Sequence, residues 1–330
     1  MRTHYKRTGS GRKLFLKAAL LALMSAVYLA QLAAQSPSES PAPYWQTAAG
    51  GKMAFDSATV KQNKTAPAYA AGSNFPLGPG DVYVPTGGAF RATNYPLINY
   101  IAFAYKMADD QEQSLRSQLP KWAMTDRFDI QGKGQGNPSK DQMRLMMQAL
   151  LADRFHLAVH YETRQVPVLA LVLDQPGKLG PLLQKHPDDS QCATTPVVPS
   201  PAPTAPPQLL DTRFPATCGG ILAMPPSAAG RSRAGARNVP MELIASSIGV
   251  GEGVDRPVLD KTGLTGMFDF AIEFTPQLNA SSPPGANAHR DLTGPTFFEA
   301  LREQLGLKLE PQTGPFDFLV ISYVEEPSTN

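Results

Sequence analysis

The amino-acid sequence predicts an α+β fold built from two related β-α-β-β-α-β modules, each a small sheet with two helices on one face. The main reason is an internal repeat, because three blocks of residues occur twice and in the same order. They are FRATNYPLINYIAFAY and AGARNVPMELIASSIG (90–105 and 234–249), KWAMTDRFDI and KTGLTGMFDF (121–130 and 261–270), and LADRFHLAVHYETRQVPVLALVL and LREQLGLKLEPQTGPFDFLVISY (151–173 and 301–323). The last pair aligns without a gap, and its apolar positions coincide.

The first block predicts a short helix after an Asn-x-Pro sequence. Asn94 and Asn238 are placed to cap this helix, and the proline two residues later has no backbone N–H that needs an acceptor. Apolar residues then recur at helical spacing over 97–105 and 241–248. We therefore treat both asparagines as repeated structural positions.

The second block predicts a strand that carries a repeated acid. RPVL at 256–259 and MFDFAIEF at 267–274 flank a glycine-containing turn, and the large apolar residues alternate, which indicates a β-hairpin. Asp129 and Asp269 stand at equivalent places beside a phenylalanine. A repeated acid could belong to a catalytic pair, but the polar face of a strand, or a bond to a neighbouring turn, explains it more simply.

The third block predicts a helix that is well marked at its start. Ser139 with Gln142, and Thr296 with Glu299, both fit the capping box. In the second copy the helix should end at Gly306, since glycine is a common C-terminal stop.

Two alternating strands should close each copy, at 307–310 and 316–324 in the second. In the first copy, His156 and His160 alternate with apolar residues and so belong to a strand. Four residues along a strand span about 13 Å, too far for both imidazoles to bind one ion. We expect a solvent-facing strand surface and no metal site.

Two further stretches invite a functional interpretation. GKGQGNPSK at 132–140 resembles a phosphate loop, but it lacks the final glycine of GxGxxG and a Walker lysine-serine pair, which favours an ordinary loop. Met143, Met146 and Met147 form a helical stripe, for which core packing is the default and an adaptable binding face the alternative. No GxSxG or HExxH motif occurs. We therefore assign no catalytic, cofactor-binding or metal-binding residue.

The first 34 residues have the order of a secretory signal: a basic region, a short apolar run at 18–30 and small residues before the expected cut. An uncleaved anchor is the alternative, and the only membrane contact that we expect. Without this segment, 24 basic and 28 acidic residues remain, a net charge of about −4. This balance argues against a nucleic-acid partner.

The two cysteines, Cys192 and Cys218, predict a disulfide if the protein is exported. The bridge would close a loop of about 27 residues, worth about 3 kcal/mol on the chain-entropy model. It would lie in a segment that holds 12 of the 32 prolines. The predicted division is signal peptide 1–34, linker 35–54, first module 55–175, proline-rich insert 176–230, second module 231–326 and tail 327–330.

Several of these stretches resemble a known family. NVPMELIASSIG, RPVLDKTGLTGMFDF, FFEALREQLGLKLE and VEEPSTN look like the carboxy-terminal half of a large acidobacterial family of exported proteins, known only as a domain of unknown function. FDSATVKQN, IAFAYKM and LLADRFHLAVHYETRQVPVLALVL resemble its amino-terminal half. The resemblance implies no activity, although some members are fused to membrane sensor peptidases. More weakly, each module is similar to the short amino-terminal modules of secretins and TonB-dependent receptors, which bind periplasmic proteins.

The sequence thus favours a non-catalytic protein of the periplasm or cell envelope that binds another envelope protein through sheet edges or helix faces, without a cofactor. Two alternatives stay open. One is a hydrolase with an acidic site between the modules, and the other is a ligand-sensing domain.

Overall fold

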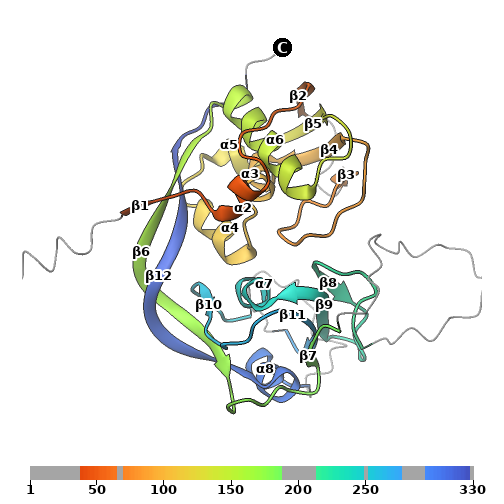
Figure 1. The fold of residues 1–330 in the computed structure, drawn as a ribbon, viewed down its shortest axis with the longest axis vertical. Coiled ribbons are helices and arrows are strands. Elements are labelled where there is room, and N and C mark those ends of the chain that lie inside the picture. The colour runs from red at the N-terminus through yellow and green to blue at the C-terminus, as the bar shows by residue number, and fades with distance from the viewer. Residues whose placement is uncertain (1–37, 65–69, 188–212, 249–251, 277–293, 328–330) are drawn as a thin grey trace, which may run out of the picture.

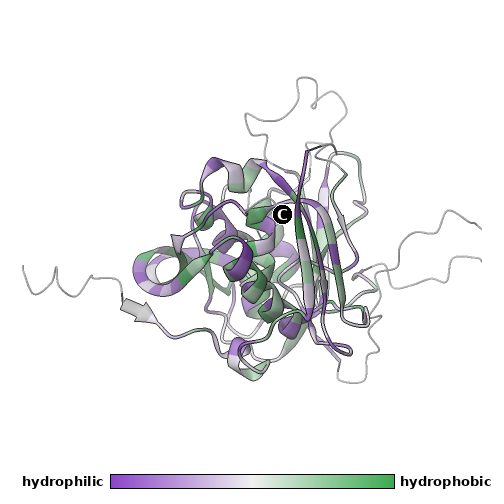
Figure 2. Cartoon of the chain, turned by 90° about the horizontal axis from the view of Figure 1, so that it is seen from above, coloured by the Kyte–Doolittle hydropathy of each residue, from purple (hydrophilic) through white to green (hydrophobic). Residues whose placement is uncertain are grey.

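The structure, a computed structural model, describes residues 38–64, 70–187, 213–248, 252–276 and 294–327. The expected signal peptide lies outside these residues. Within them the fold is α+β, as the sequence predicts, with three four-stranded sheets (Figure 1). No helix in the described part of the chain is long and apolar enough to cross a membrane. Hydrophobic residues gather in the interior, where helices face the strands (Figure 2).

The sheet of the first module is antiparallel and has the order β2-β5-β4-β3. Its strands are β2 (Ser57–Asn63), β3 (Gly72–Ser73), β4 (Ala89–Pro96) and β5 (Arg127–Lys133). Alternation of buried and exposed residues along β4 directs one face of the sheet to the core, as expected for a sheet with a single buried face.

The sheet of the second module has the order β7-β11-β9-β8. Its strands are β7 (Leu183–Lys185), β8 (Ile221–Met224), β9 (Ser232–Pro240) and β11 (Met267–Phe274). If the four strands of each sheet are numbered 1 to 4 in chain order, both sheets have the spatial order 1-4-3-2. The segment 176–230, expected to be an insert, supplies β7 and β8, because apolar residues such as the buried Leu183 complete the second core.

Seven short helices accompany the sheets among the described residues. They are α2 (Tyr44–Ala48), α3 (Leu97–Ala104), α4 (Asp109–Leu115), α5 (Lys121–Thr125), α6 (Lys140–Arg154), α7 (Met241–Ser247) and α8 (Phe297–Leu305). Helix α2 lies in the segment 35–54, which the sequence had assigned to a linker. The methionine stripe of α6 is buried, which confirms its role in core packing.

The predicted capping boxes are confirmed at both marked helices. Ser139 Oγ accepts a hydrogen bond from Gln142 N, and the Gln142 side chain accepts one from Ser139 N. Thr296 and Glu299 make the same exchange at α8. Helix α8 ends at Gly306, whose φ of 69° is in the left-handed region, as the sequence indicates.

The two expected caps at the Asn-x-Pro sequences are wrong. The residues that precede α3 and α7 are Pro96 and Pro240, and neither helix has a side-chain cap. Asn94 and Asn238 instead lie inside β4 and β9, with φ of 65° and 55°. Asparagine tolerates this left-handed conformation better than most residues, and each one lies at a β-bulge where the pairing register shifts.

One long antiparallel ribbon connects the modules. It consists of β6 (Ala158–Leu173) and β12 (Leu307–Tyr323), paired along their whole length (Figure 1). Gln165 and Pro315, which occupy the same place in the aligned blocks, face each other, so the ribbon has approximate two-fold symmetry about this pair. The two short strands expected at 307–310 and 316–324 are thus a single strand.

Each strand of the ribbon contributes to both cores. The first core is contacted by Val159, from the start of β6, and contains Leu319, from the second half of β12. The second core contains Leu171 and Leu307, from the other two halves. The modules are therefore not two consecutive blocks of sequence, because each one takes a strand segment from the other half of the chain.

The hairpin expected between 256–259 and 267–274 is also wrong. The short strand β10 (Val258–Asp260) pairs not with β11 but in parallel with β6, at Leu169–Leu171. The Gln118 side chain binds the backbone of β12: its Nε2 donates to Leu319 O at 3.1 Å, and its Oε1 accepts from Ile321 N at 3.0 Å. Near its start, at Tyr161–Thr163, β6 pairs in the antiparallel direction with β1 (Ser38–Ser40).

Candidate functional site

The repeated acids hold the two bulges. Asp129 Oδ1 accepts a hydrogen bond from Asn94 N at 2.8 Å and one from Asn63 Nδ2 at 3.0 Å. Asp269 Oδ1 accepts one from Asn238 N at 3.0 Å. Each carboxylate thus binds the backbone N–H of the left-handed asparagine on the neighbouring strand, which stabilises a conformation that is otherwise unfavourable.

The second of these acids has a histidine partner. His186 Nδ1 lies 2.6 Å from Asp269 Oδ1, and since a carboxylate only accepts, the hydrogen lies on Nδ1. The Asp269 side chain is fully buried, whereas Asp129 is half-buried. The two acids lie in different sheets, each with its own partners, so the structure does not bring them together. Nor do they line the cavities described below.

The other residues that the sequence singled out lie apart from one another. Cys192 is outside the described residues, so its bridge to Cys218 stays a prediction. His156 is not on a strand but has φ 49° between α6 and β6, and its side chain is exposed. His160 contacts Ser322 and Glu162 on the ribbon surface. In the described part of the chain no group of His, Cys, Asp or Glu is arranged to bind a metal.

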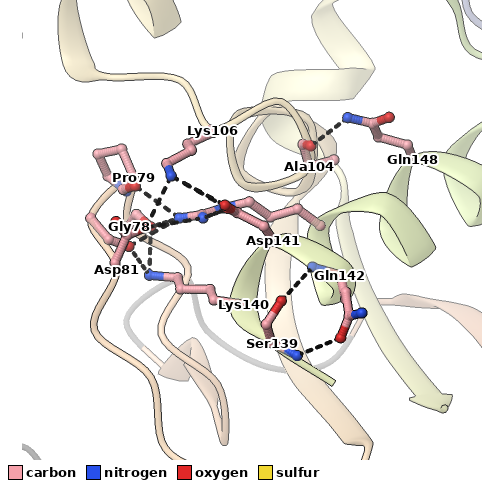
Figure 3. A network of polar contacts seen from close by, with 12 residues as sticks. Gly78, Pro79, Asp81, Ala104, Lys106, Ser139, Lys140, Asp141, Gln142 and Gln148 are labelled. Atoms are coloured by element: carbon pink, nitrogen blue, oxygen red, sulfur yellow. Dashed lines mark hydrogen bonds and ion pairs between the residues drawn. The ribbon is translucent and has the colours of Figure 1, made fainter. Parts of the chain in front are cut away.

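A charged cluster that sequence reasoning missed lies at the start of α6 (Figure 3). The Lys140 side chain is directed at the glycine-rich loop 76–82, where its Nζ donates to Gly78 O at 2.8 Å and Gly80 O at 2.6 Å. One turn later, Arg144 Nη2 donates to Pro79 O at 2.8 Å and Gly80 O at 3.0 Å. Both side chains are buried, Lys140 to 5% and Arg144 to 0% exposure.

Two carboxylates and a third cation complete this cluster. Arg144 forms an ion pair with Asp141 on its own helix, and its Nη1 lies 3.6 Å from Asp81 Oδ1. Lys106 Nζ, after α3, lies 3.0 Å from Asp81 Oδ1 and 3.4 Å from Asp141 Oδ1. The cluster fastens loop 76–82 to α6, and it carries three cations against two carboxylates.

Burial dominates the electrostatics of the cluster. It lowers the pKa of the Lys140 amine to about 7; the nearby Arg144 charge adds to this effect and Asp81 opposes it. Burial also lowers the pKa of Arg144, against the attraction of Asp141 and Asp81. Burial alone would raise the pKa of Asp81, but Lys106 and the other cations outweigh it, so the pKa of Asp81 is lowered.

Two cavities lie between the modules, next to this cluster. The first has a volume of about 440 Å³ and lies against the ribbon, between the α3–α4 turn and α7. The second has a volume of about 390 Å³ and lies between loop 76–82, the start of α6, β8 and α7. Pro79 and Leu243 line both cavities, so the two are neighbours in one cleft to which both modules contribute.

Fold and site together define an α+β protein whose two modules share a ribbon and enclose a cleft. Residues 98–324, about two thirds of the chain, match the family described as "Protein of unknown function (DUF3738)". The chain therefore belongs to this family. No curated protein and no solved structure matches it.

Proposed function

We propose that this protein is a non-catalytic, exported protein of the cell envelope that binds a partner polypeptide in the cleft between its modules. One observation carries the proposal: the two cavities of about 440 and 390 Å³ lie side by side and are each lined by both modules. Cavities of this size accommodate several side chains or a small ligand.

The lining of the first cavity indicates the kind of partner. Its walls include the apolar surfaces of Trp45, Tyr161 and Phe316, which favour apolar side chains. Asp260 and the exposed Glu242 also line it, and they favour a basic group on the partner. A segment that combines apolar and basic residues therefore suits this cavity best.

The cellular location belongs to the same proposal and is supported by the sequence. The basic and apolar order of residues 1–34 is typical of export, and an oxidising compartment suits a bridge between Cys192 and Cys218. A hydrolase between the modules has no comparable support, because Asp129 and Asp269 are engaged in separate sheets. The cavity volume favours ligand sensing as the second candidate function.

In-cell photocrosslinking tests the proposal. A photoreactive amino acid replaces Leu243, which lines both cavities, and in a control it replaces Phe298, an exposed residue of α8 that lines neither. We expect one dominant envelope protein to be crosslinked from position 243 and not from 298. Glu242→Lys should weaken this crosslink, whereas Glu303→Lys, an exposed acid of α8, should not.

Two results would contradict the proposal. Equal crosslinking from positions 243 and 298 would show that the partner does not bind specifically in the cleft. A purified protein that carries a small molecule in the cleft, with no crosslinked protein, would favour the ligand-sensing function instead.

A further inference from the structure

The cavity beside Lys140 differs in its lining from the first one. Its walls are mostly apolar side chains, including Val82, Leu222 and Leu243, with glycine backbone and Ser247, and Lys140 is the charged residue among them. The strand β8 borders it with Ile221 and Leu222. Within the described residues, β8 is an edge strand that pairs only with β9, and no described strand pairs with its second edge.

The Lys140 ammonium has an unused donor. Two of its three N–H groups are accounted for by Gly78 O and Gly80 O. No carboxylate of the described residues lies within ion-pair distance of its Nζ, because Asp81 and Asp141 pair with Lys106 and Arg144. A buried ammonium with no carboxylate in direct contact is unfavourable, and an anion in the adjoining cavity would relieve this.

The charge of the cluster fits a single carboxylate. When Lys140 is protonated, three cations against two carboxylates leave one positive charge in excess, and of the three only Lys140 lines this cavity. A phosphate group would call for more donors, but the guanidinium of Arg144 is already bound to loop carbonyls and Asp141. The apolar walls, in turn, favour apolar side chains next to the anion.

We propose that this cavity captures the C-terminal carboxylate of the partner polypeptide, bound at Lys140, with its last residues extended along the free edge of β8. The inference rests on the proposed function and specifies which end of the partner the cleft recognises. Main-chain hydrogen bonds to β8 would align the peptide, as in other complexes in which a peptide adds a strand to a sheet. Its terminal apolar side chains would contact Val82, Leu222 and Leu243.

The test compares peptides that differ only at their end. Fluorescent hexapeptides that vary over Ala, Val, Leu and Phe at their last three positions are prepared with a free C-terminal carboxylate and as C-terminal amides. Fluorescence polarisation with the whole mature protein measures their affinities. We expect the best carboxylate peptides to bind at least about tenfold more tightly than their amides, since the amide loses a charge-assisted hydrogen bond.

Lysine variants identify the amine that is responsible for the preference for the carboxylate. Lys140→Met should abolish the preference for the carboxylate, whereas Lys61→Met, at an exposed position of β2, should leave it unchanged. If Lys140→Met does not fold, NMR of ¹³Cε-labelled lysine in the unmodified protein decides. A bound carboxylate peptide should then raise the pKa of Lys140, and its amide should not.

Equal affinity for carboxylate and amide peptides, or no binding by either set, would overturn the inference. An unchanged preference in a folded Lys140→Met variant would do so too. If the Leu243 crosslink to a single envelope protein persisted in that case, only the mode of recognition would be wrong and the proposed function would stand.

Discussion

The buried carboxylate of Asp269 offers a sharp test of how the second sheet is held together. We expect Asp269→Ala to lower the free energy of unfolding by about 3–5 kcal/mol, the range for removing one partner from a buried, hydrogen-bonded charge. The side chain is fully buried, and its loss takes an acceptor from the Asn238 backbone N–H and from the His186 imidazole. Each buried donor left without an acceptor accounts for about 1–3 kcal/mol of this total.

Asp129→Ala is the matched control, because Asp129 makes the same bond to Asn94 from a half-buried position. Of the two donors that this change releases, the side-chain amide of the half-buried Asn63 can turn to water, so we expect a smaller loss of about 1–2 kcal/mol. Urea denaturation followed by circular dichroism measures both values. Asp269→Asn keeps an acceptor in place and should fall between Asp269→Ala and the unmodified protein.

Two results would refute this reasoning. A loss below about 1 kcal/mol for Asp269→Ala would mean that its bond to Asn238 N does not hold the bulge. Equal losses for Asp129→Ala and Asp269→Ala would mean that burial does not set the difference between the two acids.

Three further predictions concern single positions. The pKa of Lys140 is about 7 in the folded chain against an ordinary lysine value of 10.5, so between these two pH values the unfolded state binds more protons than the folded state. The free energy of unfolding should therefore rise with pH in this range. Lys140→Met should flatten this rise, as measured by urea denaturation from about pH 7 to 9. Gly306→Ala should cost about 1–3 kcal/mol in the same assay, because φ is 69° and the new Cβ would lie 2.6 Å from a backbone nitrogen, whereas Gly136→Ala, with φ 59° and open space, should cost about 1 kcal/mol. Peptide mapping of the exported protein without reductant should yield one fragment that links Cys192 and Cys218, and labelling of either thiol would contradict the bridge.

Local signals in the sequence were predictive where a few neighbouring residues decide the structure. The boxes at Ser139 and Thr296 and the stop at Gly306 depend on contacts within one helical turn. The Asn-x-Pro sequences show the limit of such reasoning. Asparagine is favoured both as a helix cap and in the left-handed conformation, and a carboxylate some thirty residues away, Asp129 or Asp269, decides between the two.

Long-range pairing was not predictable in the same way. Alternation in the 256–274 region identified strands but not their partners, because the apolar pattern of β10 suits any apolar sheet edge and the ribbon offers one. The two strands expected at 307–310 and 316–324 run on as one, and the intervening Pro311 and Pro315 are tolerated because β12 pairs on one side only among the described residues. The spacing of Lys140 and Arg144 on one face of α6 was a usable signal, but loop 76–82 gave no sign that its carbonyl groups face them.

Because of the shared ribbon, segments that are close in sequence are not always the ones that form a core together. A peptide expressed as residues 55–175 would lack Leu319 and the rest of the β12 segment that completes its core, and it would end in β6 without any of its partner strands. Cleavage between residues 187 and 213, by contrast, would leave both pieces interlocked through sixteen residues of paired strand. The halves should therefore behave as complementing fragments that require each other to fold, so the cleft between them is built into the folding unit itself.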